Sequence, residues 1–324
     1  MRVHLTFDIE VWCGGWDQLD ASFPSAFDRY VWGRSKAGEY ALPRNLQILR
    51  RHGLKGVFFV EPLFSFRFGH AHLCTIVDLI RASGQSVELH LHPEWVDEIR
   101  PPLIGDCARK RQHLTDYSRD EQAALLRAGR SAVERASGQP VTAFRSGGYA
   151  ANRSTYDALA EVGIHTDSSL NATYDRTGGT LGRHADLRQP SHVGAVAVHP
   201  VTVFNDALGR PRHLQVGACS FAEMREVLDR SHAAGHEEVV VVSHNFELLK
   251  PGGARPDRVV ERRFDRLCAY LAACPDRFEV GAFPVAGGLV EPPSASVSRS
   301  ADPVRVGPLA TAMRLAEQAV RRLP

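Results

Sequence analysis

Short apolar runs alternate with amphipathic segments along most of this chain. The apolar runs are rich in β-branched and aromatic residues, as in VHLTF at 3–7 and EVVVVSHN at 238–245. Between them, apolar residues recur every three or four positions, the spacing of one helix face. The pattern predicts strands at 3–7, 55–60, 86–91, 141–145, 164–167, 195–200, 238–245 and 278–283, and helices at 43–53, 72–84, 118–138, 153–163, 220–235 and 257–274.

Strict alternation of strands and helices indicates a parallel sheet with helices outside it. Two of the helices begin with capping boxes, Ser118 with Glu121 and Ser220 with Glu223. The number of β/α units favours closure into a barrel over residues 1–289. An open doubly wound sheet is the alternative, but no G-x-G-x-x-G follows the first strand, which removes the usual dinucleotide reason for it.

The segment 290–324 departs from this pattern. Its first part, EPPSASVSRSADP, is rich in Pro and Ser and predicts a linker. The following PLATAMRLAEQAVRRLP predicts an amphipathic helix with Leu309, Met313, Ala316 and Val320 on one side. We expect this helix to pack against the barrel.

Composition narrows the class of protein. The 324 residues are 44% hydrophobic and 23% charged with a net charge of +2, so neither nucleic acid nor an anionic membrane is an expected partner. The N-terminus begins with a predicted strand and lacks the apolar core of a signal peptide. The chain has no run of about 18 uncharged apolar residues, so we expect no membrane span. The six cysteines form no CxxC pair, as expected of reduced thiols. These features predict a cytoplasmic protein and leave its oligomeric state open.

Groups that bind metals or move protons stand at the ends of the predicted strands. In chain order they are Asp8, Glu10, Glu61, His90, His92, Arg145, Asp167, His199 and His244. In a β/α barrel the carboxyl ends of the strands meet at one rim, which holds the active site. We therefore expect these side chains to converge.

Such a set of side chains favours metal-assisted hydrolysis of an amide or ester. Carboxylate and imidazole ligands suit Zn²⁺ or a similar divalent ion, which polarises a carbonyl and activates water. A carboxylate can take the proton of that water, and a histidine can protonate the leaving group. No G-x-S-x-G is present to indicate a serine nucleophile.

The motifs and their order resemble those of the polysaccharide deacetylases with NodB homology, carbohydrate esterase family four, as a divergent subgroup. The stretches similar to that family's five motifs are LTFDIEVW, ELHLHPEW, FRSGGY, HTDSS and VVSHNFE, within about residues 3–283. The resemblance implies a distorted (β/α)7-8 barrel and a divalent metal site. It also implies removal of N-acetyl, or sometimes O-acetyl, groups from sugars.

The resemblance further implies roles for single residues. It makes Asp8 the catalytic base and His244 the general acid. Arg145 then orients the base, and Asp167 tunes the acid. Tyr149 closes the third motif, where a backbone N–H helps hold the oxyanion.

Two departures from the family's pattern concern the metal. Position 9 is isoleucine where the family has a second aspartate, so the carboxylate ligand is Glu10 or Asp8, and we favour Glu10. Four residues after His90 the chain has Glu94 instead of histidine, so His92 or Glu94 completes the site. We favour His92, because imidazole is the commoner partner at such a site, which makes Glu10, His90 and His92 the predicted ligands.

The expected substrate is an acetylated amino sugar or a related small molecule, because a cytoplasmic enzyme is not expected to meet cell-wall polymer. Four aromatic residues lie near the predicted rim: Trp12, Trp16, Trp95 and Tyr149. They either stack on a sugar ring or wall the mouth of the barrel, and we take Trp95 and Tyr149 as substrate-binding. Two alternatives stay open. One is a metal-dependent amidohydrolase acting on another C–N bond, such as a deformylase or ureide hydrolase, and the other is a non-catalytic carbohydrate-binding barrel.

Overall fold

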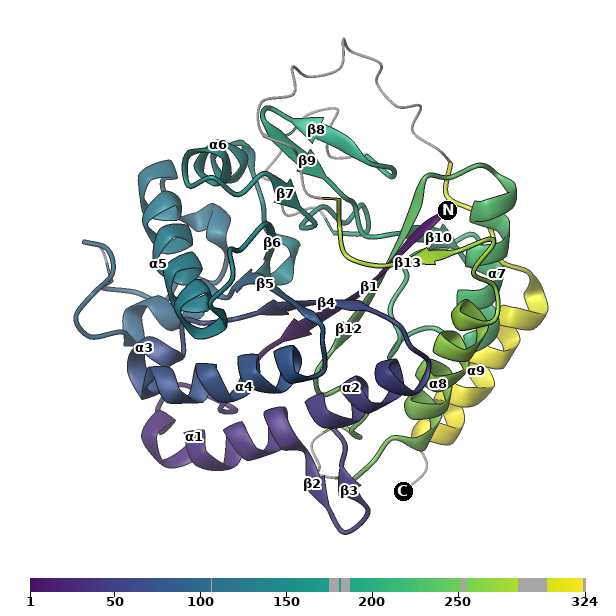
Figure 1. Cartoon of the computed structure of the whole chain (residues 1–324), viewed down its shortest axis with the longest axis horizontal. Coiled ribbons are helices and arrows are strands. Elements are labelled where there is room, and N and C mark those ends of the chain that lie inside the picture. Colours follow the sequence, from purple (N-terminus) through teal and green to yellow (C-terminus); the bar gives the residue numbers. More distant parts are fainter. Residues whose placement is uncertain (106, 175–180, 182–186, 252–254, 285–301, 323–324) are drawn as a thin grey trace. The chain divides into compact units, whose positions relative to one another are not determined.

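The computed structural model describes residues 1–105, 107–174, 181, 187–251, 255–284 and 302–322. Residues 1–56, 204–281 and 303–324 form one compact unit, and residues 57–203 and 282–302 form a second. Figure 1 labels their helices and strands. Most of the predicted Pro/Ser-rich linker, residues 291–301, lies outside the described residues.

The first unit is built around a buried central strand. Its parallel strands are β1 (Arg2–Ile9), β12 (Glu238–His244) and β13 (Glu279–Val280). Both β12 and β13 pair with β1, and the β1–β12 register places Asp8 opposite His244. Residues 3–9 of β1 are all buried, including the polar residues His4, Thr6 and Asp8, which alternate with apolar ones.

Helices and short hairpins complete the first unit. They are α1 (Leu19–Phe27), a π-helical turn (Asp28–Trp32), β2 (Arg34–Ser35) with β3 (Gly38–Glu39), α2 (Leu42–Arg51), β10 (Val203–Asn205) with β11 (Pro211–His213), α7 (Phe221–Ala233), α8 (Arg258–Ala272) and α9 (Pro308–Arg322). The sequence pattern does not predict α1, because Pro24 lies inside it and proline removes a helix hydrogen bond. Packing of Phe23 on Phe27, with ring centroids 5.7 Å apart, helps to hold this helix.

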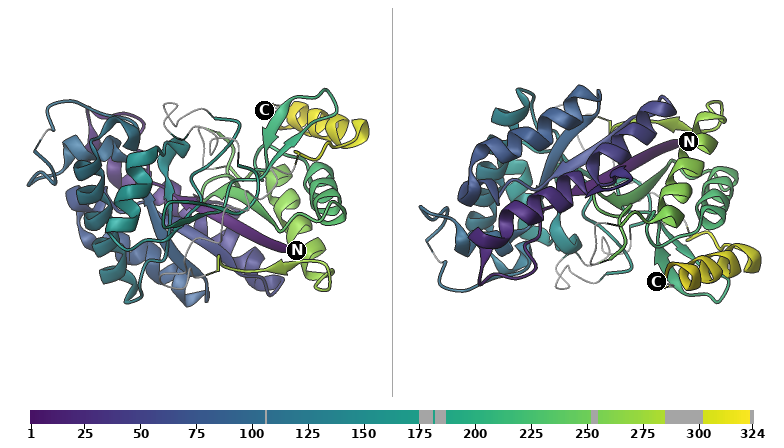
Figure 2. Two further views of the ribbon diagram at one scale, coloured as in Figure 1. Left: turned by 90° about the horizontal axis from the view of Figure 1, so that it is seen from above. Right: turned by 90° about the horizontal axis from the view of Figure 1, so that it is seen from below.

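The C-terminal helix α9 packs through a polar side. It lies beside α7, as Figures 1 and 2 show. Its buried Arg314 donates to Glu223 at 2.8 Å and to Asp206 at 3.1 Å. The predicted apolar side is exposed instead, with Leu309 at 76% and Val320 at 55%. The expected packing of this helix therefore depends on buried ion pairs rather than on its apolar stripe.

The second unit contains a run of parallel strands. In spatial order they are β4 (Gly56–Val60), β5 (Ser86–Leu91), β6 (Ala143–Ser146), β7 (Thr166–Asp167) and β9 (Val196–Val198), with β8 (Ser191–Val193) antiparallel to β9 at the edge. The helices are α3 (Ser65–Phe68), α4 (His70–Ala82), α5 (Arg119–Ser137) and α6 (Arg153–Glu161), with 3₁₀ turns at Pro93–Glu98, Leu114–Asp116 and Gly147–Tyr149.

Helix α5 lies between α4 and α6 (Figure 1) and packs closely on β5. A Cβ at Gly129 would lie only 2.8 Å from Cδ2 of Leu91, so glycine permits this approach. The capping boxes predicted for α5 and α7 are both present. The predicted α/β barrel type, with parallel strands and outer helices, is confirmed. Within the described residues, no helix combines the length and apolar character needed to cross a membrane.

Candidate active site

Two carboxylates and an imidazole converge where β1 and β12 end. Asp8 and Glu10 are two residues apart on extended backbone, which directs both side chains to one side. With His244, their ligand atoms all lie within 4.8 Å of one another. Asp8 and Glu10 are only 3% and 7% exposed. Two buried carboxylates at this separation require positive charge or a proton nearby, so this pair of carboxylates suits a cation.

A carboxylate three residues further along the chain holds His244. The imidazole Nδ1 lies 2.8 Å from Oε1 of Glu247, whose Oε2 accepts the backbone N–H of Gly217 at 2.6 Å. A Cβ at Gly217 would lie 2.7 Å from this carboxylate, so glycine makes room for it. Burial lowers the pKa of His244, but the hydrogen bond with Glu247 and the charges of Glu10, Glu247 and Asp8 raise it to about 9. The imidazole is therefore protonated at neutral pH.

The residue after His244 fixes the main chain at Glu10. The side-chain oxygen of Asn245 accepts the N–H of Glu10 at 3.1 Å, and its amide nitrogen donates to the carbonyl of Glu10 at 3.0 Å. The same amide nitrogen donates to the carbonyl of Tyr30 at 2.5 Å. Trp12 then donates its indole N–H to Oε2 of Glu10 at 2.7 Å. Both the backbone and the carboxylate of Glu10 are thus held within the first unit.

In the second unit, the two predicted metal histidines lie together at the end of β5. The ring centroids of His90 and His92 are 4.8 Å apart. Nδ1 of His90 lies 2.7 Å from the carbonyl oxygen of Arg145. A carbonyl can only accept, so this nitrogen carries the proton and Nε2 is the nitrogen suited to bind a metal.

His92 has the same kind of support. Its Nδ1 lies 3.2 Å from the carboxylate of Glu94. The ring lies against the backbone at Gly147, where a Cβ would be 2.7 Å away. The carboxylate of Glu94 therefore accepts a hydrogen bond from Nδ1 of His92, an arrangement common among metal-bound histidines.

Arg145 and Asp167 are both completely buried in the second unit. Arg145 donates to the carbonyl oxygen and the hydroxyl of Ser168, each at 3.0 Å. Asp167 accepts from the backbone N–H and the hydroxyl of Ser169 and from the hydroxyl of Tyr156. Burial raises the pKa of Asp167 to about 6, although these bonds and the charge of Arg145 lower it.

The structure adds a carboxylate beside His244 that the resemblance does not name. The resemblance assigns the tuning of His244 to Asp167, but the carboxylate bonded to the Nδ1 of this histidine is that of Glu247. The stretch VVSHNFE contains Glu247, and a carboxylate three residues after a strand-end histidine is the signal that could have identified it.

The turn Gly147–Tyr149 has unusual backbone geometry. Gly148 has φ 59° and Tyr149 has φ 60°, both in the left-handed region. This region is uncommon for tyrosine, and such strain recurs at functional sites. Ser146 holds the turn through a 2.7 Å hydrogen bond to the carbonyl of Ala150.

Trp95 is predicted to bind substrate, but its burial does not fit that role. Its ring is 1% exposed and packs edge-on against Phe68, with centroids 6.0 Å apart. No face is available for a sugar, so Trp95 is a core residue. Glu61 is also buried, and it accepts the backbone N–H groups of Leu63 and Phe64 at 2.7 and 3.3 Å. This carboxyl group thus supports the turn that precedes α3.

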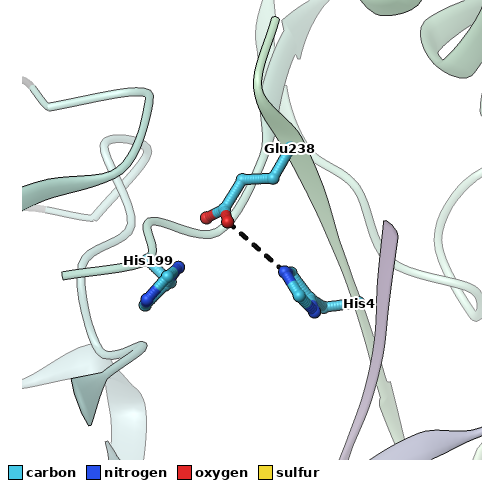
Figure 3. Close-up of side chains that lie close together, drawn as sticks. All are labelled: His4, His199 and Glu238. Carbon is cyan, nitrogen blue, oxygen red and sulfur yellow. Dashed lines mark hydrogen bonds and ion pairs between the residues drawn. The ribbon is translucent and has the colours of Figure 1, made fainter. Parts of the chain in front are cut away.

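Other candidate histidines are placed by structural contacts. His199 packs against Phe283, with ring centroids 4.8 Å apart and the ring planes tilted by 42°. His4 lies near the start of β1, where its Nε2 is 3.3 Å from the carboxylate of Glu238 (Figure 3). Its Nδ1 is 2.9 Å from the carbonyl of Gly281. These contacts give His4 a structural role.

Comparison with known proteins gives the fold. No protein-family model and no curated protein matches the chain. A solved structure of a Mycobacterium smegmatis protein assigned to the polysaccharide deacetylases matches with a TM-score of 0.55 and 20% identity, covering 87% of this chain and 86% of that one. The chain has the polysaccharide deacetylase fold. The predicted resemblance is therefore confirmed for the fold.

Two further likenesses to solved structures are more distant. A carbohydrate esterase family 4 pseudoenzyme from Bacillus anthracis has a TM-score of 0.42 and 15% identity, covering 86% of this chain and 63% of that one. A family 4 carbohydrate esterase from Streptomyces lividans has a TM-score of 0.41 and 13% identity, covering 87% and 93%.

Proposed function

We propose that this protein is a metal-dependent deacetylase that removes an N-acetyl group from a sugar or a sugar-containing small molecule. The observation that supports this most is the convergence of Asp8, Glu10 and His244 within 4.8 Å, on a fold shared with polysaccharide deacetylases. Carboxylates beside a protonated imidazole are the groups that amide hydrolysis needs for proton transfer.

Glu10, His90 and His92 would hold the ion, and this donor set suits Zn²⁺. In both histidines Nδ1 is bonded to an oxygen acceptor, which favours Nε2 as the ligand atom. The bond from His92 to Glu94 favours His92 as the ligand and Glu94 as its support. When bound, a divalent ion supplies Lewis-acid polarisation of the acyl carbonyl.

The residues of this chain would carry out the proton transfers. Asp8 takes a proton from the water that attacks the acyl carbon. His244 gives its proton to the departing amine nitrogen, and a pKa of about 9 keeps it charged for that step at neutral pH. Arg145 provides the cation that keeps the base ionised, and the backbone N–H of Tyr149 donates to the oxyanion.

An acetate-release assay on a panel of N-acetylated, O-acetylated, formylated and ureido sugars tests this function. We expect acetate release from an N-acetylated member, inactivation by EDTA, and recovery with Zn²⁺ or Co²⁺. Asp8→Asn and His244→Ala should each lower the rate by about 100-fold or more, while the exposed-site variant Asp276→Asn keeps it.

Formate or ammonia release in place of acetate would favour an amidohydrolase acting on another C–N bond. Stoichiometric metal without turnover of any substrate would favour a non-catalytic barrel. Full activity in Asp8→Asn would refute the role of this residue as the base.

A further inference from the structure

We infer that Trp12 is a positioning residue that sets the orientation of the Glu10 carboxylate. This inference rests on the proposed function, because it assigns to Glu10 the role of a metal ligand. The observation behind it is the 2.7 Å hydrogen bond from the indole Nε1–H of Trp12 to Oε2 of Glu10. Neither the sequence motif nor the likeness of fold assigns a role to Trp12.

The two oxygens of Glu10 have different surroundings. Oε2 receives the indole N–H, while Oε1 lies 4.0 Å from Nε2 of His244. An indole nitrogen can only donate, so this bond holds one carboxylate oxygen, Oε2 in this structure, toward Trp12. Oε1 is then the oxygen directed toward the cluster with Asp8 and His244, as a carboxylate that binds through one oxygen requires.

The main chain at Glu10 is fixed independently of Trp12. Asn245 clamps both the N–H and the carbonyl of Glu10, so a change of orientation must come from side-chain torsions. A charged acceptor paired with an N–H at 2.7 Å is a strong hydrogen bond. Removing the donor should therefore release the carboxylate while the main chain stays in place.

A second tryptophan lies beside the indole of Trp12. Trp16 meets it edge-on, with ring centroids 6.4 Å apart and planes at 88°. Both rings are partly buried in the segment that follows β1. Trp16 is therefore a matched control, because Trp16→Phe removes a neighbouring indole N–H but leaves the bond to Glu10 intact.

The test compares Trp12→Phe with Trp16→Phe in a calorimetric titration of the metal-free protein with Zn²⁺. Trp12→Phe keeps an aromatic ring but loses the donor and part of the indole, and Trp16→Phe makes the same change in size at the neighbouring ring. We expect it to weaken Zn²⁺ binding by about 10- to 100-fold, the usual effect of losing a hydrogen bond behind a metal ligand, while Trp16→Phe changes it by less than about threefold. Unchanged binding in Trp12→Phe, or equal losses in both variants, would overturn the inference.

A second measurement separates this inference from the proposed function. The chain has four tryptophans, so its indole N–H signals are few in a ¹H–¹⁵N spectrum of the metal-free protein. The signal that disappears in Trp12→Phe should move when Glu10→Gln removes the charge of its acceptor, and the Trp16 signal should move much less. If the wild type binds no Zn²⁺, the proposed function fails, and this signal alone decides whether Trp12 orients Glu10. A signal that does not move refutes the orientation.

Discussion

Replacing Glu247 with glutamine should make His244 a weaker base and should remove much of the pH dependence of stability that His244 causes. The negative charge of Glu247 contributes twice, through its 2.8 Å hydrogen bond with Nδ1 and through Coulombic attraction. Glutamine has no such charge, and its amide would turn a donor toward either His244 or the N–H of Gly217. Burial, which lowers the pKa of His244, is then opposed by the charges of Glu10 and Asp8 without the contribution of Glu247.

The size of this effect follows from the raised pKa. The folded protein holds the proton of His244 up to a pKa of about 9, against 6.5 ordinarily. The protonated imidazole therefore contributes stability that is complete below pH 6.5 and is lost as the pH rises through 9. That difference corresponds to about 3 kcal/mol in the free energy of unfolding.

The measurement uses metal-free protein so that bound metal does not alter the titration. NMR titration of the imidazole gives the pKa of His244, and urea unfolding at pH 6, 7.5 and 9 gives the stability. We expect Glu247→Gln to lower this pKa by at least about one unit and to flatten the loss of stability between pH 6.5 and 9. Glu279→Gln, at an exposed position on β13, is the matched control. A wild-type His244 that titrates at or below 6.5, or one that Glu247→Gln leaves unchanged, would refute the reasoning.

Three further predictions concern stability, each measurable by urea unfolding. Burial raises the pKa of Asp167 from 3.8 to about 6, so ionising this carboxyl group should lower the free energy of unfolding by about 3 kcal/mol. Stability should therefore decline as the pH rises from 3.8 through about 6. Asp167→Asn should remove this decline, and an unchanged pH profile in the variant would contradict the prediction. Gly129→Ala should cost about 1–3 kcal/mol despite the higher helix propensity of alanine, because its Cβ would overlap Leu91; a gain in stability would show that α5 can move away. Arg314→Met should cost about 3–5 kcal/mol, because it leaves the buried carboxylates of Asp206 and Glu223 without their cation. Arg153→Met, which breaks an exposed i,i+4 ion pair, should cost less than about 1 kcal/mol. Similar losses in both variants would refute a special role for the buried ion pairs.

The sequence by itself determined the features that depend on neighbours along the chain. Alternating apolar runs and helical periodicity predicted most strands and major helices, and the capping boxes of α5 and α7 are where the pattern places them. The two-residue spacing of Asp8 and Glu10, and of His90 and His92, predicted that each pair would lie together, because extended backbone directs alternate side chains to the same side.

Only the tertiary structure decided which groups those side chains contact. A tryptophan at a strand end can face solvent or the core, and packing against Phe68 buried Trp95. The carboxylate that holds His244 became identifiable as Glu247 once the turn after β12 and the backbone at Gly217 were in place. Helix α9 packs through Arg314 because two buried carboxylates from distant parts of the chain, those of Glu223 and Asp206, accept its hydrogen bonds. Periodicity specifies which residues share a face, but burial and charge pairing depend on what the rest of the chain brings to that face.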